Sequence, residues 1–163
     1  MRVGHGFDIH RLQPGGDLII GGVSIEWTHS LVAHSDGDVL MHAICDSILG
    51  AAGLGDIGQH FPDTDMLNSR RESRDFLIAS QTLVREADLS ILHIDCTVVA
   101  ENPKLSPYFE SMKANIAAAL SIEADSINIK AKTAEGLGVI GRGQGIAAFA
   151  VALLATCQTR RST

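Results

Sequence analysis

An alternation of apolar and polar residues in two separate segments constrains the fold of this 163-residue chain more than any other feature. The apolar row of the first segment consists of Leu92, Ile94, Cys96, Val98 and Ala100, with His93, Asp95 and Thr97 between them. Residues 127–131 repeat the pattern. Since successive side chains of a strand point to opposite faces, both segments are predicted to be strands with one apolar face. That face suits packing beneath helices, whereas the mixed face would meet solvent or another subunit.

A first helix is predicted at about residues 38–52, where apolar residues recur at helical spacing. Asp36 or Asp38 can cap its N-terminus, because a short carboxylate side chain accepts hydrogen bonds from the first backbone N–H groups of a helix. Gly53 or Gly55 can end it, since glycine readily adopts the left-handed conformation that follows many helices.

Two further helices complete the expected set of elements. The second is expected to open with the capping-box pattern Ser69–Glu72, and the third with Ser106–Pro107, a cap residue before a proline. The apolar run 146–157 is expected to be a buried strand or a strand leading into a helix. The resulting order indicates an α/β (α+β) fold with helices packed on one face of a mixed, mainly four-stranded sheet. The length fits a single domain, residues 1–163.

Charge and composition argue against several classes of function. The formal net charge is −6 and the clearest basic pair inside the chain is Arg70-Arg71, so no nucleic-acid partner is expected. The run 146–157 is too short to cross a bilayer and the first residues lack an apolar signal region, so no membrane role is expected. Three cysteines far apart in the sequence do not suggest a disulfide framework, which favours a cytoplasmic location.

The first candidate site is an Asp-x-His pair near the N-terminus, Asp8 and His10. On a strand the two side chains project from the same face and can supply two ligands to one zinc ion. His42, near the start of the first predicted helix, is the best candidate for a third ligand, and Asp46 could orient its imidazole. One carboxylate and two imidazoles leave an open coordination position, as in catalytic zinc sites. A hydrogen-bonded surface pair is the alternative for Asp8 and His10.

Polar residues and glycines also gather in three other segments. Residues 33–38 hold His34 among ordinary cap residues, and because capping does not require this histidine, it could contact an anion. Residues 55–65 form a long connection rich in carboxylates, which is typical of functional loops and also of surface turns. Residues 136–141 spell G-x-G-x-x-G, but a strand-like run follows instead of a helix, so a dinucleotide site is rejected. A tight loop with backbone N–H groups close to a ligand is favoured.

These segments occur together, in the same order and at similar spacing, in a known enzyme family. The motifs are Gly6–His10, His34–Asp38 with His42, Gly55–Gly58, Phe61–Asp65, Asn102–Lys104, Lys132–Glu135 and Gly141–Gly143. Over essentially the whole chain they resemble those of the 2-C-methyl-D-erythritol 2,4-cyclodiphosphate synthases. Each motif alone is weak evidence, but their combination is specific for this family.

The resemblance implies an enzyme, a phosphorus–oxygen lyase of the non-mevalonate isoprenoid pathway. Its substrate would be 4-diphosphocytidyl-2-C-methyl-D-erythritol 2-phosphate, whose 2-phosphate attacks the β-phosphate and releases CMP to give the 2,4-cyclodiphosphate. By the same resemblance, Asp8, His10 and His42 would hold a catalytic zinc ion. Glu135 would bind a second ion, magnesium or manganese, that bridges the α- and β-phosphates.

The resemblance also assigns the remaining site residues, with His34 and Thr133 as stabilisers of the transition state. The substrate-binding positions are Asp8, Ile9, His10, His34, Ser35, Asp56, Ile57, Gly58, Phe61, Pro62, Asp63, Thr64, Asp65, Ala100, Glu101, Asn102, Pro103, Lys104, Leu105, Ser106, Ala131, Lys132, Thr133, Ala134, Glu135, Val139 and Arg142. Residues 100–106 and 131–133 match the family's cytidine pocket. Lys132 departs from the threonine expected there, and it is either a cation near the phosphates or a solvated lysine at a strand end.

The family is a homotrimer with active sites between adjacent subunits, which would account for the mixed second face of the predicted strands. The chain would then be a single-domain protomer of a trimer. A cavity on the family's trimer axis accepts isoprenoid phosphates between a Phe, an Arg and a Glu, and here these positions are Val139, Arg142 and Gln144. Two alternatives to the synthase are a zinc-dependent phosphohydrolase, which would leave a linear product, and a catalytically silent trimer that binds cytidine nucleotides or isoprenoid phosphates.

Overall fold

The structure is a computed structural model that describes residues 1–62, 64 and 71–157 of the chain. Its strands are β1 (Arg2–Pro14), β2 (Leu18–Ile20), β3 (Val23–Ile25), β4 (His29–Leu31), β5 (Leu89–Val99), β6 (Ile127–Lys132) and β7 (Gly145–Thr156). Its α-helices are α1 (Val39–Ala52), α2 (Ile57–His60), α3 (Ser73–Glu86), α4 (Phe109–Leu120) and α5 (Gly138–Gly141). Two short 3-10 helices are η2 (Ser106–Tyr108) and η3 (Ala124–Ser126).

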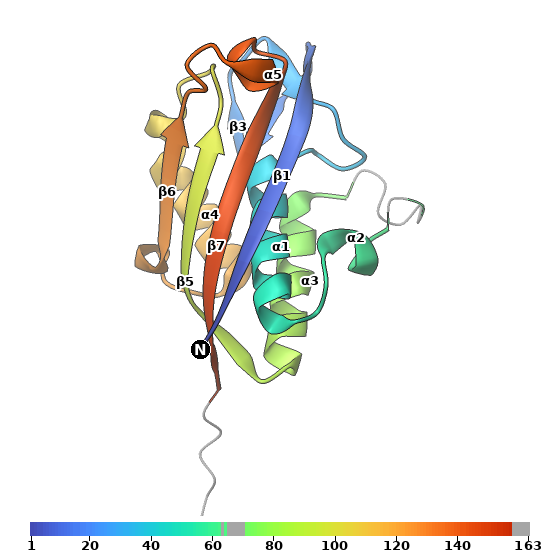
Figure 1. The fold of residues 1–163 in the computed structure, drawn as a ribbon, viewed down its shortest axis with the longest axis vertical. Helices are drawn as coiled ribbons and strands as arrows, with labels where there is room; N and C mark the ends of the chain where they lie inside the picture. The colour runs from blue at the N-terminus through green and yellow to red at the C-terminus, as the bar shows by residue number, and fades with distance from the viewer. Residues whose placement is uncertain (63, 65–70, 158–163) are drawn as a thin grey trace, which may run out of the picture.

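Five strands form one sheet in the order β4-β1-β7-β5-β6, and β2 pairs with β3 in a separate ribbon. β5 and β6 run parallel, whereas the other neighbours run antiparallel, so the sheet is mixed. Figure 1 shows α1, α3 and α4 behind this sheet, on one face. The prediction of a mixed sheet covered by helices on one face is confirmed. The sheet has one more strand than expected, because the three-residue β4 pairs with the end of β1.

The first helix is α1, which packs between β1 and α3 and is buried along almost its whole length. Asp38 is its N-cap, and the carboxylate of this buried residue accepts a hydrogen bond from the Met41 N–H at 3.1 Å. Gly53 ends the helix with a left-handed φ of 77°. Both termini therefore use one of the two residues predicted for them, and they hold α1 in a fixed position against the sheet.

The other two helices begin later than predicted. α3 begins at Ser73 with Glu72 as its N-cap and no capping hydrogen bond from that side chain, so Glu72 does not complete a capping box. Ser69 and Arg70 lie outside the described residues. Ser106 does not cap α4 either, because Ser106–Tyr108 forms the 3-10 helix η2 and α4 follows at Phe109. A proline near the start of a helix fits both arrangements, which is why the pattern placed the boundary too early.

The alternation along β5 breaks near its start. A register shift between Ile91 and His93 marks a bulge in the pairing of β5 with β7. An extra residue in one strand reverses the facing of the side chains beyond it, so Leu92 is 44% exposed instead of facing the core. From Ile94 onward the predicted apolar row is buried, and the second row at residues 127–131 also faces the helices.

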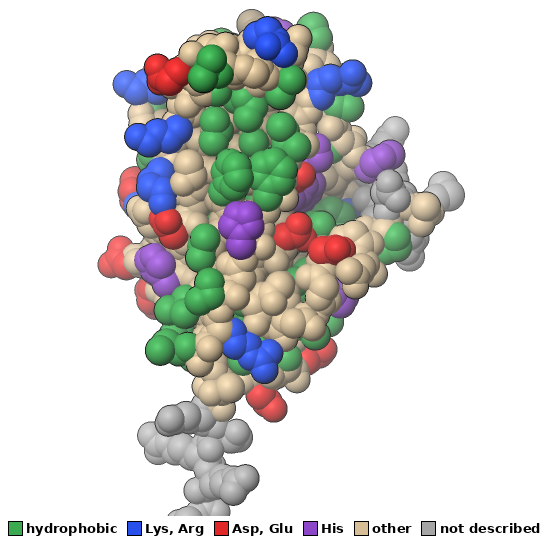
Figure 2. Space-filling model, viewed as in Figure 1, with side chains coloured by type: hydrophobic (Ala, Val, Ile, Leu, Met, Phe, Trp, Pro, Cys, Tyr) green, Lys and Arg blue, Asp and Glu red, His purple; other side chains and the backbone are tan. Residues whose placement is uncertain are grey.

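The face of the sheet away from the helices is apolar at its centre. Phe7 and Phe149 are cross-strand partners on β1 and β7 with ring centroids 4.9 Å apart, and both are more than one-third exposed. Ile9 and Val151 are exposed on the same two strands. Figure 2 shows hydrophobic side chains gathered on this open face. Among the described helices, none has the length and apolar character needed to cross a membrane.

Candidate active site

The site begins with a row of residues on the helix-facing side of β1. Gly6, Asp8 and His10 succeed one another on this side, while the residues between them face the open side of the sheet. At the glycine, α1 lies directly against the strand, because a Cβ atom there would sit 1.9 Å from the Ala43 carbonyl oxygen. The missing side chain thus lets the helix approach until His42, the neighbour of Ala43, reaches Asp8 and His10.

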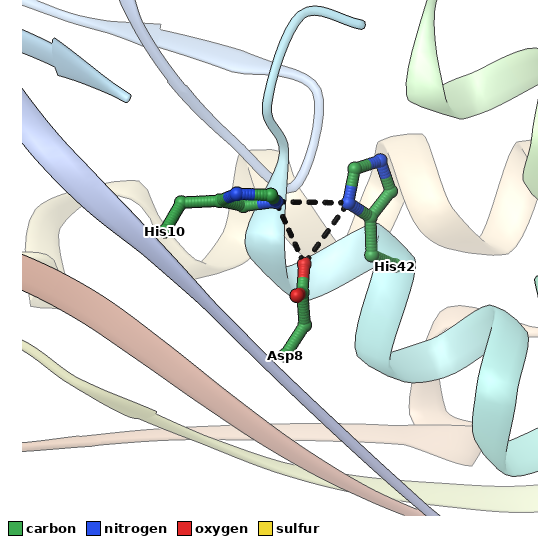
Figure 3. Close-up of side chains that lie close together, drawn as sticks. All are labelled: Asp8, His10 and His42. Carbon is green, nitrogen blue, oxygen red and sulfur yellow. Dashed lines mark hydrogen bonds and ion pairs between the residues drawn. The ribbon is translucent and has the colours of Figure 1, made fainter. Parts of the chain in front are cut away.

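Asp8, His10 and His42 converge on one point (Figure 3). Nε2 of His10 and Nδ1 of His42 lie 2.9 and 3.0 Å from Oδ2 of Asp8, and 3.2 Å from each other. All three side chains are partly buried, and their ligand atoms lie within 4.8 Å of one another. Two imidazoles and a carboxylate form a ligand set that suits a divalent transition metal and leaves a coordination position open. The structure thus brings together the three residues that were predicted to form one metal site.

Charge in this cluster depends on the contacts of Asp8. Burial on its own would raise the pKa of Asp8, but hydrogen bonds from His10 and His42 and the charges of these rings lower it far below 3.8. Burial would likewise lower the pKa of His42, but the hydrogen bond with Asp8 and the charge of that carboxylate raise it above 6.5. Below this raised pKa the His42 ring carries a second proton, which must leave before the ring can bind a metal.

Cation binding is expected to weaken as the pH falls through the raised pKa of His42, because proton and metal compete for the ring. The stability of the metal-free fold should change in the opposite direction and fall as the pH rises. The raised pKa contributes stability that is fully present below the unfolded value of 6.5 and is lost as the pH rises through the folded value. Calorimetric titration with Zn²⁺ at about pH 6 and about pH 8, in buffers of different ionisation enthalpy, measures the released protons. Equal affinity at both pH values without proton release would contradict this prediction.

The other ring nitrogen of His42 faces two serine hydroxyls. Nε2 lies 2.8 Å from Oγ of Ser73 and 3.3 Å from Oγ of Ser35. Ser73 is the first residue of α3, and its hydroxyl donates a hydrogen bond to Asp36. Sequence reasoning did not find Ser73, because a serine at a helix start is common and 31 residues separate it from His42. Asp36 was considered only as a possible helix cap.

Asp46 and Asp56 both accept hydrogen bonds from the backbone of the segment around α2. Oδ1 of Asp46 accepts from the Ile57 N–H at 2.8 Å, and Oδ1 of Asp56 accepts from the Gln59 N–H at 2.9 Å. Among the residues that the structure describes, no hydrogen bond joins Asp46 to His42, and the hydrogen-bond partners of Nε2 in that ring are the two serines. Asp46 therefore fixes the start of α2 instead of the imidazole.

A cavity of about 160 Å³ opens beside the metal cluster. Its lining residues are His10, Ala33, His34, Ser35, His42, Ile57, Phe61 and Phe76. Phe61 packs on Phe76 with ring centroids 5.1 Å apart, and the Arg71 guanidinium lies over both rings. Residues from four of the motifs thus border one hollow. Pro62 and Thr64 of the predicted set are exposed, whereas Asp63 and Asp65 lie outside the described residues.

A second hollow, of about 300 Å³, lies where β5 and β6 end and η2 begins. Its lining residues are Ala100, Glu101, Asn102, Pro103, Lys104, Leu105, Ser106, Phe109, Ala131, Lys132 and Thr133. This set contains every residue predicted for the cytidine pocket, together with Phe109, which the sequence did not suggest. The structure therefore gathers these two segments around one space.

The loop after β6 carries Glu135 two residues beyond Thr133, which lines this second hollow. Oγ1 of Thr133 donates a hydrogen bond to the exposed Glu135 carboxylate, and Glu101 accepts one from the Ala134 N–H at 3.2 Å. Glu135 has a left-handed φ of 52°. Glu135 is not part of the Asp8 cluster, and β7 separates β1 from β5 in the sheet. One chain thus presents the metal cluster and the second hollow as two separate places.

The glycine-rich segment before β7 forms a tight loop. A Cβ atom on Gly141 would lie 2.2 Å from the Gly136 carbonyl carbon, so the two ends of the segment are in contact. The short helix α5 lies between them and β7 follows, so the helix that a dinucleotide fingerprint requires is absent from this described segment. Val139 and Gln144 line a third hollow of about 540 Å³ beside β1, and Arg142 is exposed.

Comparison with known proteins decides the family. The family model described as YgbB family matches residues 1–155. The chain belongs to the YgbB family. This YgbB-family chain is 54% identical over 154 residues to the 2-C-methyl-D-erythritol 2,4-cyclodiphosphate synthase of Bordetella bronchiseptica, covering 94% of this chain and 95% of that one. It is 52% identical over 155 residues to the protein of the same name from Nitrosomonas europaea, covering 95% of each chain. The prediction of an enzyme of this synthase family is confirmed.

Solved structures agree with this assignment. The YgbB-family chain matches the bifunctional IspDF from Campylobacter jejuni with a TM-score of 0.92 and 44% identity, over 95% of this chain and 42% of that longer chain. It matches the CDP complex of IspF from Plasmodium falciparum with a TM-score of 0.84 and 38% identity, over 95% of this chain and 96% of that one. The mixed sheet and its helices are therefore the fold of this family.

Proposed function

We propose that this chain converts 4-diphosphocytidyl-2-C-methyl-D-erythritol 2-phosphate to 2-C-methyl-D-erythritol 2,4-cyclodiphosphate with release of CMP. The observation that carries the proposal is the convergence of Asp8, His10 and His42 beside a cavity, in a chain whose relatives bear the name of this synthase. The CDP in the related Plasmodium falciparum structure supports a cytidine nucleotide as part of the substrate.

Two kinds of cation fit the side chains of the proposed site. Asp8, His10 and His42 suit zinc, because two of the three donors are imidazole nitrogens and a hard cation would prefer oxygen. When bound, zinc would supply Lewis-acid stabilisation of charge on the β-phosphate. Glu135 suits magnesium or manganese, since these ions often take one carboxylate from the protein and the remaining ligands from phosphates and water.

The proposed reaction forms one phosphorus–oxygen bond and breaks another within a single molecule. An anionic oxygen of the 2-phosphate attacks the β-phosphorus, and the bond to the oxygen that bridges the α- and β-phosphates breaks. CMP leaves with that bridging oxygen. No general base is needed, because the attacking oxygen carries no proton. The side chains therefore act by positioning, while His34 and Thr133 would donate hydrogen bonds to the charge that develops on the β-phosphate.

A complete site would form between neighbouring chains of a homotrimer. In one chain the metal cluster lies at β1 and α1, whereas the hollow proposed for cytidine lies beyond β7, at the ends of β5 and β6. A substrate would therefore bring together the metal cluster of one subunit and the cytidine hollow of the next. The exposed apolar centre of the open face, with Phe7 and Phe149, supports such an assembly, because a large exposed apolar patch is typical of an interface.

Phosphorus NMR of the purified protein with the cytidylylated methylerythritol 2-phosphate tests the proposed reaction. CMP together with a cyclic diphosphate, both lost on chelation and restored by Zn²⁺ with Mg²⁺, is the expected result. CMP with a linear product would identify a phosphohydrolase instead. No turnover by the metal-replete assembly, with CMP binding retained, would identify a binding protein and would overturn the proposal.

Glu135→Gln is expected to raise the concentration of Mg²⁺ or Mn²⁺ needed for half-maximal activity by roughly tenfold, because an amide is a weaker ligand for these ions. Titration of each ion against the rate of CMP release measures the change, with zinc held saturating. Glu123→Gln is the control, since Glu123 is an exposed carboxylate beside η3. An unchanged midpoint in Glu135→Gln would place the second ion on other residues.

Phe149→Asp is expected to dissociate the trimer, because a carboxylate would be buried without a partner between subunits, at about 3 kcal/mol or more for each chain. Light scattering during gel filtration measures the mass. Ile78→Asp is the matched control, because Ile78 is 37% exposed and Phe149 is 39% exposed, but Ile78 lies on α3. If Phe149→Asp remained a trimer, or if Ile78→Asp dissociated to the same extent, the open face would not be the interface.

A further inference from the structure

His42 is held from two sides, and Ser73, the nearer partner on its far side, has no part in the proposed reaction. Nε2 lies 2.8 Å from Oγ of Ser73, a residue with no exposed surface. The backbone N–H of Ser73 donates to Oδ2 of Asp36 at 3.1 Å, and the Ser73 hydroxyl donates to Oδ1 of the same carboxylate. Two hydrogen bonds to one carboxylate fix the serine, and through it the plane of the imidazole.

The protons of this chain of contacts can be placed from the chemistry of each group. An ionised Asp36 carboxylate only accepts hydrogen bonds, so the one hydroxyl proton of Ser73 is committed to it. The oxygen of Ser73 is then an acceptor, and its hydrogen bond with His42 requires a proton on Nε2. In the metal-free site Nδ1 also carries a proton, which it donates to Asp8. If a metal ion takes the place of that proton, the proton held on Nε2 leaves the Nδ1 lone pair directed at the point where Asp8 and His10 converge.

We propose that Ser73, backed by Asp36, is a positioning residue that fixes the His42 ring in the orientation and tautomer needed to bind a metal ion. The proposal rests on the proposed function only in taking His42 as a metal ligand. Ser35 is the weaker partner of the same nitrogen, because its Oγ lies 3.3 Å away and also accepts from the Gly37 N–H at 3.2 Å. Since Ser73 begins α3, the start of that helix is tied to the metal site.

Ser73→Ala tests the proposal through metal affinity. It is expected to weaken Zn²⁺ binding by the assembled protein roughly 10–100-fold, which is typical when a partner of a metal-ligating histidine is removed. Competition with a chromophoric chelator measures the affinity without any catalytic turnover. Ser80→Ala is the matched control, because Ser80 is a serine of the same helix with no exposed surface, and its hydroxyl neighbours the Cys45 thiol. Ser80→Ala should bind Zn²⁺ as the wild type does.

Asp36→Asn separates the role of the carboxylate from that of the serine. The amide can present a donor to the Ser73 oxygen, so the direction of the hydrogen bonds is no longer fixed. A several-fold loss of Zn²⁺ affinity is expected, and adding Asp36→Asn to Ser73→Ala should change affinity less than twofold, because Asp36 acts through Ser73. If the two substitutions lowered Zn²⁺ affinity additively, Asp36 would not act through Ser73, and that part of the proposal would be overturned. If Ser73→Ala does not fold, Asp36→Asn alone carries the test, and unchanged affinity would overturn the proposal.

Long-range ¹H–¹⁵N NMR of the histidine rings gives a signature that a purely structural role would not produce. In the Zn²⁺-loaded wild type, the His42 ring is expected to keep its proton on Nε2 and to bind through Nδ1, whereas Zn²⁺-loaded Ser73→Ala is expected to show a mixture of Nδ1-bound and Nε2-bound rings. An Nδ1–H ring in the Zn²⁺-loaded wild type, or Zn²⁺ affinity in Ser73→Ala equal to that of Ser80→Ala, would overturn the proposal. A wild type that binds no Zn²⁺ would instead refute the metal site of the proposed function, so the two failures are distinguishable.

Discussion

His42→Ala is expected to release zinc and to abolish cyclisation while the fold and the assembly survive. The imidazole supplies one of three converging donors, and an aspartate with one histidine cannot complete a zinc site. Zinc affinity should fall by roughly 100-fold or more, since even the loss of a ligand's hydrogen-bond partner costs 10–100-fold. The rate should fall by roughly 10²–10³-fold or more, because a Lewis acid contributes several kcal/mol to stabilising a phosphoryl transition state.

Metal content per chain, light scattering and CMP release measure these three outcomes on one preparation of His42→Ala. His93→Ala is the control, because His93 is an exposed histidine at the bulge of β5 and should keep its full content of zinc. The fold should survive because the His42 side chain faces the site, whereas the core side chains of α1 remain. Retained zinc in His42→Ala would refute its assignment as a ligand, and loss of the trimer would show that the metal supports assembly.

Local periodicity was enough to predict most elements and the shared face of Asp8 and His10. The row on β1 follows directly from the strand period of two, so Asp8 and His10 had to share a face once that segment was extended. His42 could be placed beside them only by assigning it to the start of a helix, and the ends of α1 follow from the capping preferences of Asp38 and Gly53. The pairing of Asp8 with His10 and the ends of α1 were predictable because each depends on neighbours within about one helical turn. The family resemblance was what assigned His42, 34 residues from Asp8, to the same cluster.

Contacts between distant segments account for what the sequence did not reveal. The bulge that exposes Leu92 depends on the pairing of β5 with β7, which no pattern within β5 encodes. The hydrogen bond between Ser73 and His42 joins α3 to α1, and a serine at a helix start is ordinarily read as a local feature. Gly6 was grouped with a polar segment, although its role is to let a helix approach a strand.

Gly6→Ala is expected to disable the metal site from a distance, because it would separate β1 from α1. A Cβ atom on Gly6 would lie 1.9 Å from the Ala43 carbonyl oxygen and 2.7 Å from the Ser47 amide nitrogen, and both are backbone atoms that cannot rotate away. The helix must therefore move. Overpacking of a core costs about 1–3 kcal/mol and occasionally more, and we expect about 3 kcal/mol here because backbone has to shift. A displacement of about 1 Å between His42 and Asp8 would also weaken Zn²⁺ binding. We expect a loss of roughly 100-fold, the same as the loss of rate when a catalytic group is misplaced by that distance.

Gly50→Ala separates this steric effect from a general effect of replacing glycine. Gly50 lies on α1, where an added Cβ atom would come no closer than 4.0 Å to the His5 carbonyl oxygen, so alanine should stabilise the helix by up to about 1 kcal/mol. Thermal unfolding of the metal-free proteins and Zn²⁺ competition together measure both effects. Equal Zn²⁺ affinity in Gly6→Ala and Gly50→Ala would show that the ligands converge without close packing of strand and helix. A loss of Zn²⁺ affinity in Gly6→Ala but not in Gly50→Ala would show that close packing of β1 on α1 at Gly6 is required for the three ligands to converge.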